Sequence, residues 1–277
     1  MWKEKKEARS SRKFIFLREE RYQLQGLRNE NYIEAHLKVS CLIGESDQVR
    51  YMVEMPVYKQ TNEDGMYKWV GDLHELRERI VFSLNENGQI GVIHNISEIQ
   101  LKWDEIKSKV FLRHKNEKYR NMLIKGIEKV LSNDDQLAGA LRFVMPYLLL
   151  FPGIHSREYK KNEPVSGYRE LPNFIATKNI PIITEETVSE TENGKYQIDV
   201  IGEIDETKFE QQKVTAMLRL LKNRPRVPTI VELKYMERYL LDEWPWSSQS
   251  MCMSLAQIPG SLYREEKNIL KMIKDEI

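Results

Sequence analysis

The sequence predicts an α+β protein in which antiparallel β-meanders pack on amphipathic helices, arranged in two lobes. Three observations predict this class. Runs of alternating apolar and polar residues occur in both halves of the chain, as in strands with one buried face. Asn-Gly pairs, which favour tight hairpins, adjoin such runs at 87–88 and 193–194. Between these regions, apolar residues recur at helical spacing.

The predicted elements follow from these periods. Strands are expected at 33–43, 49–57, 80–84, 90–93, 180–191, 196–204, 230–241 and 248–258. Helices are expected at 97–110, 116–131 and 135–144, and in the tail from Leu262. Ser97 and Ser132 are the expected N-caps of the first and third of these helices.

The predicted organisation has four parts. Residues 1–21, with an excess of basic side chains, are expected to form a solvated arm that is free to dock on an acidic surface. Residues 22–152 form a β-meander followed by helices. Residues 153–180, rich in Gly, Pro and Asn, are expected to link the lobes. Residues 181–277 form a second β-rich lobe that ends in a helix.

Composition limits the function classes. The chain has 277 residues, of which 41% are hydrophobic and 31% charged, as in a folded globular protein. Its net charge of +1 gives no overall attraction to nucleic acid or to an anionic membrane. Cys41 and Cys252 are too few for a disulfide framework. No signal peptide or membrane-spanning run is apparent, so we expect a soluble, cytoplasmic protein.

Motifs for cofactors and metals are missing from the sequence. There is no glycine-rich phosphate loop and no Gly-x-Ser-x-Gly elbow. The 5 histidines are scattered, without the close pairing of a zinc site. We therefore expect no cofactor and no metal, and a binding protein rather than an enzyme.

One set of residues suggests a nuclease as an alternative. Asp199 lies in an apolar strand, and Glu232 and Lys234 form a Glu-x-Lys in a later strand. This set resembles the core of the restriction-endonuclease-like nucleases. The resemblance implies that the carboxylates hold a divalent metal and that the lysine positions the attacking water. However, any solvated strand face can also read Glu-x-Lys, and the usual Pro-Asp before the first carboxylate is missing.

Another segment suggests a carrier as an alternative. Residues 239–242 read Tyr-Leu-Leu-Asp, and Trp244, Pro245 and a further alternating strand follow. This arrangement resembles hairpins in the curved sheets of bacterial lipoprotein-carrier-like proteins. The resemblance implies a cavity that holds an apolar ligand. Proteins of that kind are normally exported, whereas this sequence begins without a leader.

The main prediction is a non-enzymatic protein-binding adaptor or a structural component of a larger bacterial assembly. Trp244 and Trp246 flank a proline and are large contact anchors if exposed. Arg224 and Arg226 lie in a loop fixed by prolines and are further contact candidates. A protein is the expected partner, because the net charge gives no support to nucleic acid. Neither the identity of the partner nor the oligomeric state follows from the sequence.

Overall fold

The computed structural model describes residues 10–24, 26–43, 48–154, 157–160, 163–175, 178–214, 216, 230–241, 247–258 and 262–273. The strands are β1 (Ser10–Leu24), β2 (Leu27–Ile43), β3 (Val49–Gln60), β4 (Arg79–Leu84), β5 (Ile90–Ile93), β6 (Val165–Ile175), β7 (Lys178–Glu190), β8 (Tyr196–Ile204), β9 (Glu232–Leu241), β10 (Ser247–Ile258) and β11 (Leu262–Ile273). The helices are α1 (Gly65–Asp72), the 3-10 turn η1 (His74–Arg77), α2 (Ile96–Arg113), α3 (Glu117–Val130), α4 (Asp134–Leu141) and α5 (Tyr147–Leu150).

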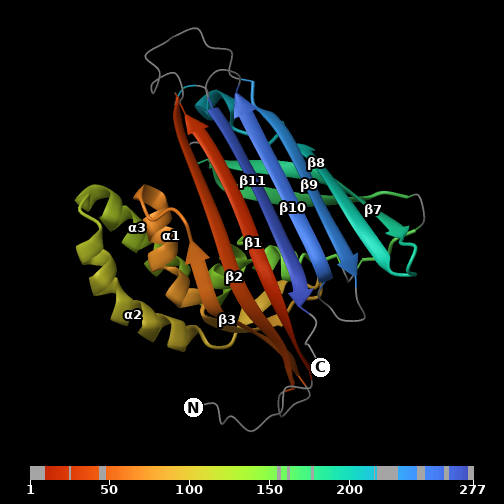
Figure 1. The fold of residues 1–277 in the computed structure, drawn as a ribbon, viewed down its shortest axis with the longest axis horizontal. Helices are drawn as coiled ribbons and strands as arrows, with labels where there is room; N and C mark the ends of the chain where they lie inside the picture. Colours follow the sequence, from red (N-terminus) through yellow and green to blue (C-terminus); the bar gives the residue numbers. More distant parts are fainter. Residues whose placement is uncertain are drawn as a thin grey trace. The chain divides into compact units, whose positions relative to one another are not determined.

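The strands form one antiparallel sheet of 11 strands in the order β5-β4-β3-β2-β1-β11-β10-β9-β8-β7-β6 (Figure 1). The first and last strands of the chain, β1 and β11, are neighbours within this order. All other neighbours are consecutive in sequence, so a meander leads away from this pair on each side. The predicted α+β class, with two lobes of meanders packed on helices, is therefore wrong. The strands at 80–84, 90–93, 196–204, 230–241 and 248–258 are confirmed within a residue or two.

The predicted N-terminal arm contains a strand. Within β1, Phe14 and Phe16 are buried, and Glu20 continues the same alternation as a buried carboxylate. Arg18 and Glu20 form ion pairs with Arg264 and Glu266 of β11. The sequence pattern does not predict this strand, because charged residues occupy buried positions that are normally apolar.

The predicted C-terminal helix is also a strand, β11. Its buried residues alternate from Glu266 through Asn268 to Leu270. Two of these three residues are polar, so the apolar residues alone do not show the period of two that is typical of a strand. The remaining apolar residues, including Leu262 and Ile269, happen to fit helical spacing. The predicted linker at 153–180 likewise contains β6 and the start of β7.

The chain divides into two compact units. Unit 1 comprises Met1–Phe16, Ile33–Ser156 and Lys271–Ile277, and unit 2 comprises Leu17–Tyr32 and Arg157–Leu270. The boundary after Ser156 falls inside the predicted linker.

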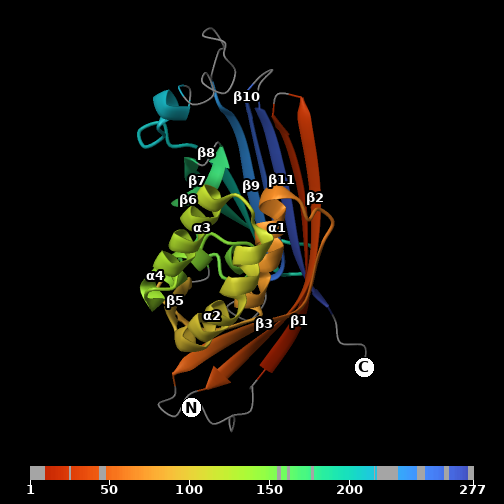
Figure 2. The same ribbon diagram turned by 90° about the vertical axis from the view of Figure 1, so that its left-hand side faces the viewer.

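Unit 1 contains α1 to α5, and α2 buries the face that its sequence predicts. That buried face consists of Ile99, Trp103, Ile106 and Val110. Figure 2 shows α4 beside β5, and the Arg142 guanidinium Nε at the end of α4 donates to the Ile90 carbonyl at 2.7 Å. An aromatic cluster lies in the core, with ring centroids of Phe82 and Phe151 5.0 Å apart. None of the helices in the described ranges combines the length and hydropathy that crossing a bilayer requires.

Two predicted helix caps differ from the structure. At the start of α2, Asn95 rather than Ser97 is at the N-cap. Its side-chain oxygen accepts from the Val81 amide of β4 instead of from a helix amide, and its side-chain nitrogen donates to Glu98 Oε2 at 3.3 Å. At the start of α4, the Asn133 side chain accepts from the Gln136 amide at 2.8 Å, one residue after the predicted Ser132. Asparagine and serine cap helices equally well, so neighbouring candidates are hard to separate by sequence.

Candidate functional site

The predicted contact residues Trp244, Trp246, Arg224 and Arg226 lie outside the described residues. They remain predictions.

The structure does not bring the nuclease-like residues together. Asp199 on β8 lies opposite Arg238 on β9, and the Arg238 Nε donates to its carboxylate at 2.6 Å. Glu232 lies six residues earlier on β9, about 20 Å away along an extended strand, and accepts from the Gln257 amide at 2.5 Å. Lys234 lies opposite Leu255 of β10. In the described ranges, no three His, Cys, Asp or Glu side chains gather as a metal site would need.

Unit 2 instead buries a network of charges on one face of β6, β7 and β9. Arg169, Glu186 and Glu237 are 3%, 0% and 0% exposed. The Arg169 guanidinium donates from Nε to Glu237 Oε1 at 2.9 Å and from Nη2 to Glu237 Oε2 at 3.1 Å. Its Nη2 also lies 3.6 Å from Glu186 Oε1. Buried charges of this kind are tolerated only when paired and hydrogen-bonded.

Hydroxyl groups complete this buried network. The Tyr239 hydroxyl donates to Glu237 Oε2 at 2.9 Å, and the Tyr235 hydroxyl donates to Glu237 Oε1. The Tyr159 hydroxyl donates to Glu186 Oε2 at 2.7 Å, and Arg157 Nη1 lies 2.7 Å from Glu186 Oε1. Two guanidinium groups thus balance two carboxylates, and the network as a whole is neutral.

Two glycines make room for this network. The strand register places Gly167, Thr184, Gly202 and Tyr235 in one row across β6 to β9. A Cβ on Gly202 would lie 2.5 Å from Ile182 Cγ2 and 2.8 Å from Tyr235 Cδ1. A Cβ on Gly167 would lie 2.6 Å from Thr184 Oγ1 and 2.7 Å from Glu186 Oε1. Glycine is therefore required at both positions by the crowding of neighbouring side chains.

The protonation of the network disfavours nucleophilic catalysis by its thiol and phenols. Burial, followed by the neighbouring carboxylate of Glu237, raises the pKa of Tyr239 and of the Cys252 thiol well above their usual ranges. Burial disfavours the Arg169 cation, but Glu237 together with Tyr239 and Tyr235 outweighs burial and raises the pKa of the guanidinium well above its usual range. The thiol and phenol therefore stay protonated, whereas a nucleophile needs a lowered pKa. We interpret the network as structural.

The opposite face of β6, β7 and β8 is exposed and mixes apolar side chains with carboxylates. Ile183 is opposite Glu203, and Glu185 is opposite Ile201, so isoleucine and glutamate alternate in both directions. Ile183 is 49% exposed and Ile201 is 64% exposed. Tyr168 of β6 lies opposite Ile183 and extends the apolar part of this surface. The name Ile–Glu face is used below for Tyr168, Glu170, Ile183, Glu185, Ile201 and Glu203.

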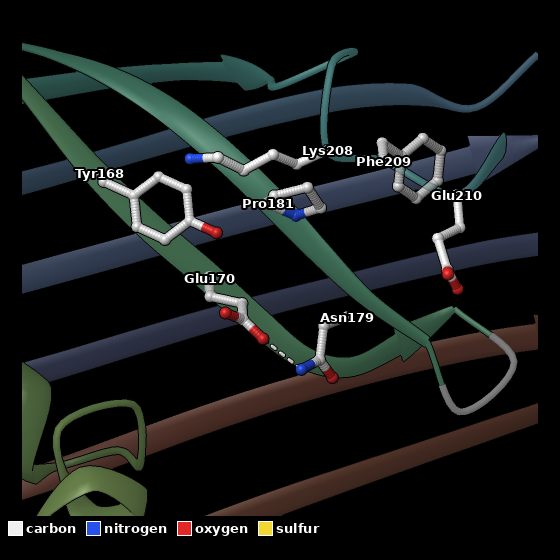
Figure 3. A pocket seen from close by; sticks show the side chains of 7 residues that line it. All are labelled: Tyr168, Glu170, Asn179, Pro181, Lys208, Phe209 and Glu210. Atoms are coloured by element: carbon white, nitrogen blue, oxygen red, sulfur yellow. Dashed lines mark hydrogen bonds between the residues drawn. The ribbon is translucent and has the colours of Figure 1, made fainter.

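A hollow of about 370 Å³ adjoins this face (Figure 3). Its lining residues are Tyr168, Glu170, Asn179, Pro181, Lys208, Phe209 and Glu210. Figure 3 shows Pro181 between the Tyr168 side and the Phe209 side of the hollow. The Lys208 Nζ lies over the Tyr168 ring, 4.4 Å from its centroid. The hollow therefore combines aromatic rings with charged groups of both signs.

The sequence alone indicates one member of the buried charge network. Glu237 lies between Tyr235 and Tyr239 in the same alternation, so a carboxylate at a buried strand position was readable from β9 alone. The partner Arg169 lies in a segment that the sequence reading took for a linker. The pairing could not be predicted because it depends on the register of β6, β7, β8 and β9.

Comparison with known proteins gives no family. No family model matches the chain, and no curated protein matches it. Among the solved structures that match is one described as lipid–protein interactions in lipovitellin, with 10% identity and a TM-score of 0.43. The match covers 95% of this chain and 25% of that chain. At this identity and TM-score, the likeness carries no argument about fold or function.

Proposed function

We propose that this protein is a non-catalytic protein-binding module whose Ile–Glu face docks a basic, partly apolar segment of a partner protein. The observation that carries this proposal is the alternation of exposed isoleucines with glutamates on β7 and β8. Solvated strand faces are usually polar, so isoleucines that are 49% and 64% exposed at opposite corners of one patch are unusual.

Charge complementarity indicates a basic partner. Among the described residues of β6, β7 and β8 whose side chains point to this side, none is Lys or Arg; Lys208, from the turn after β8, lies over Tyr168. Asp199 is neutralised by Arg238 of β9, but Glu185 and Glu203 have no ion-pair partner within the described ranges. A partner with Lys or Arg beside apolar residues would match these carboxylates, which favours fast and selective association. Full burial of each isoleucine would contribute about 1.5–3 kcal/mol before the losses of association.

A defined peptide tests this proposal. We expect a labelled amphipathic peptide of lysine and leucine to bind the purified protein in a fluorescence anisotropy titration, and a glutamate–leucine peptide of the same pattern not to bind. In Ile183→Ser/Ile201→Ser, the affinity for the lysine–leucine peptide should fall about tenfold, which corresponds to about 1.4 kcal/mol.

The matched control removes apolar side chains of similar exposure from α2 and α3 in unit 1. Leu101 is 65% exposed and Met122 is 58% exposed, and Leu101→Ser/Met122→Ser should leave the affinity unchanged. Equal losses in both double variants, or equal binding of the acidic peptide, would contradict docking at the Ile–Glu face.

A carrier of a small amphipathic molecule is the second candidate, and a separate observation favours it. Asn268 of β11 is fully buried, and neither atom of its side-chain amide has a hydrogen-bond partner among the described residues. The same holds for the buried Ser254 hydroxyl on the neighbouring strand β10. Buried polar groups are nearly always satisfied, so these groups fit the polar end of a bound molecule.

Extraction of the purified protein tests the carrier. Mass spectrometry should then detect one compound in the organic extract, in a fixed ratio to protein. The extract of the Asn268→Leu/Ser254→Ala variant should lack this compound. An extract without such a compound, from protein that is folded by circular dichroism, would exclude this second candidate.

A further inference from the structure

We infer that the hollow beside Tyr168 binds a guanidinium group, supplied by an arginine side chain of the partner. This inference rests on the proposed function, because it assigns one basic group of the docked segment to one site. The hollow adjoins the Ile–Glu face directly, since Tyr168 and Glu170 belong to both.

The lining of the hollow suits a planar cation. The rings of Tyr168 and Phe209 and the ring of Pro181 provide flat surfaces, and Glu170 and Glu210 provide carboxylates. A guanidinium stacks on aromatic faces and pairs with carboxylates in the same plane, which an ammonium group cannot do. The volume of about 370 Å³ lies within the usual range of small-ligand sites.

The chain itself places a cation on the Tyr168 ring. The Lys208 Nζ lies 4.4 Å from the ring centroid, within the range of a cation–π interaction. The same Nζ lies 3.3 Å from Asp205 Oδ2. Lys208 therefore marks the ring face as a position where positive charge is stabilised.

Lys208 can be displaced from this position. Its side chain is 61% exposed, so solvent and salt screen its attraction to Asp205. The turn that carries it is fixed separately, because Asp205 Oδ1 accepts from the Thr207 amide at 3.1 Å and from the Thr207 hydroxyl at 2.5 Å. A partner cation could replace Lys208 without refolding this turn.

The charges around Tyr168 favour a further cation. Besides burial, the carboxylate of Glu170 raises the pKa of Tyr168, and Lys208 opposes this effect. Glu210 is paired with Lys213 and Asp205 with Lys208, so the carboxylate of Glu170 has no cationic partner among these groups. Glu170 accepts instead from the neutral Asn179 amide. The hollow thus offers one carboxylate that a guanidinium would neutralise.

A small probe separates this site from the docking face. We expect acetyl-arginine amide to shift the ring resonances of Tyr168 in an NMR titration, while neutral acetyl-citrulline amide does not. Lys208→Ala removes the competing cation and should tighten the binding of acetyl-arginine amide about threefold. Glu170→Gln should weaken it at least threefold.

Two control variants match these charge changes at a distance. Lys195→Ala and Glu192→Gln change exposed residues in the turn between β7 and β8, about 30 Å from Glu170 along the strand. Both should leave the affinity for acetyl-arginine amide unchanged. If Lys208→Ala and Lys195→Ala have the same effect, Lys208 is no competitor and the inference is wrong.

The two proposals fail in distinguishable ways. If the lysine–leucine peptide binds through Ile183 and Ile201 while acetyl-arginine amide never shifts Tyr168, the guanidinium site is refuted and the docking face stands. If acetyl-arginine amide binds as expected while the peptide does not bind, the site is supported and the docking face is refuted.

Discussion

Arg169 on β6 and Glu237 on β9 form a bidentate ion pair, although two strands, β7 and β8, lie between them. The guanidinium Nε and Nη2 lie 2.9 and 3.1 Å from the two carboxylate oxygens. Three strand spacings amount to about 14 Å, so both side chains must lie along the sheet and meet over β7 and β8. The register places the row of Gly167, Thr184, Gly202 and Tyr235 between the rows of Arg169 and Glu237, and Gly202 leaves one position of that row without a side chain.

Removing one partner of this pair should strongly destabilise the protein. In Arg169→Met, Glu237 remains buried without its cation, and the free energy of unfolding should fall by about 3–5 kcal/mol. In Arg169→Met/Glu237→Leu no charge is left unpaired, so most of this loss should be recovered. Urea unfolding of the two single variants and the double variant measures the difference. Additive losses in the double variant would contradict a specific pairing.

Gly202→Ala tests whether the empty position is required. The added Cβ would meet Ile182 Cγ2 at 2.5 Å and Tyr235 Cδ1 at 2.8 Å, and overpacking of this kind destabilises by about 1–3 kcal/mol. The matched control is Gly126→Ala on helix α3, where nothing lies within 4 Å of the added Cβ. That change should stabilise by about 0.5–1 kcal/mol, because alanine favours helix. Thermal unfolding of both variants should therefore shift in opposite directions.

The sequence could predict the strands whose buried positions are apolar or aromatic. In β9, Tyr235 and Tyr239 alternate with more exposed residues, and in β4 Ile80, Val81 and Phe82 form a short buried apolar run. Both strands were predicted. Hairpins with Asn-Gly were equally readable, because Gly88 and Gly194 have the positive φ angles, 73° and 72°, that these turns require.

Strands β1 and β11 could not be predicted from the sequence, because charged residues are buried on the same strand faces as the apolar residues. Glu20 in β1 and Glu266 in β11 occupy buried positions that a sequence reading assigns to solvent. Their burial is tolerated only through Arg18 and Arg264, which approach from the neighbouring strand. The pairing of the first and last strands of the chain is a long-range contact, and local periodicity carries no information about it. The same holds for Arg169, which meets its carboxylate partner 68 residues later.

Asn95→Ala should destabilise unit 1, whereas Ser97→Ala should not. The Asn95 side chain accepts from the Val81 amide at 2.9 Å and donates to the Arg79 carbonyl at 3.1 Å, which attaches the start of α2 to β4. Leaving these backbone groups unpaired should lower the free energy of unfolding by about 2 kcal/mol. Ser97 is exposed and makes no cap, so its change should stay within about 0.5 kcal/mol. A larger loss of stability in Ser97→Ala would indicate that Ser97 caps α2, as the sequence predicts, and would contradict the role given to Asn95.

The ion pairs between β1 and β11 should make stability depend on acid pH. Burial opposes ionisation of Glu266, but the guanidinium groups of Arg18 and Arg264 outweigh burial and hold the pKa of its carboxyl below the ordinary 4.5. In the unfolded chain this pKa returns to its ordinary value. Between the two values the unfolded state binds more protons, so stability is complete above the ordinary pKa and falls as pH drops through this window.

Glu266→Gln removes the titrating group and should reveal this dependence. At about pH 7 the variant leaves Arg18 and Arg264 without this carboxylate, and the free energy of unfolding should fall by about 3 kcal/mol. As pH drops toward 3, the carboxyl of the unfolded chain takes up a proton before that of the folded protein, so the native protein loses stability and its difference from the variant should shrink. Urea unfolding across this range, with Glu192→Gln in an exposed turn as control, measures the difference. A gap that stays constant from pH 7 to 3 would mean that the carboxyl has the same pKa in the folded and unfolded states, which would contradict stabilisation of its charge by Arg18 and Arg264.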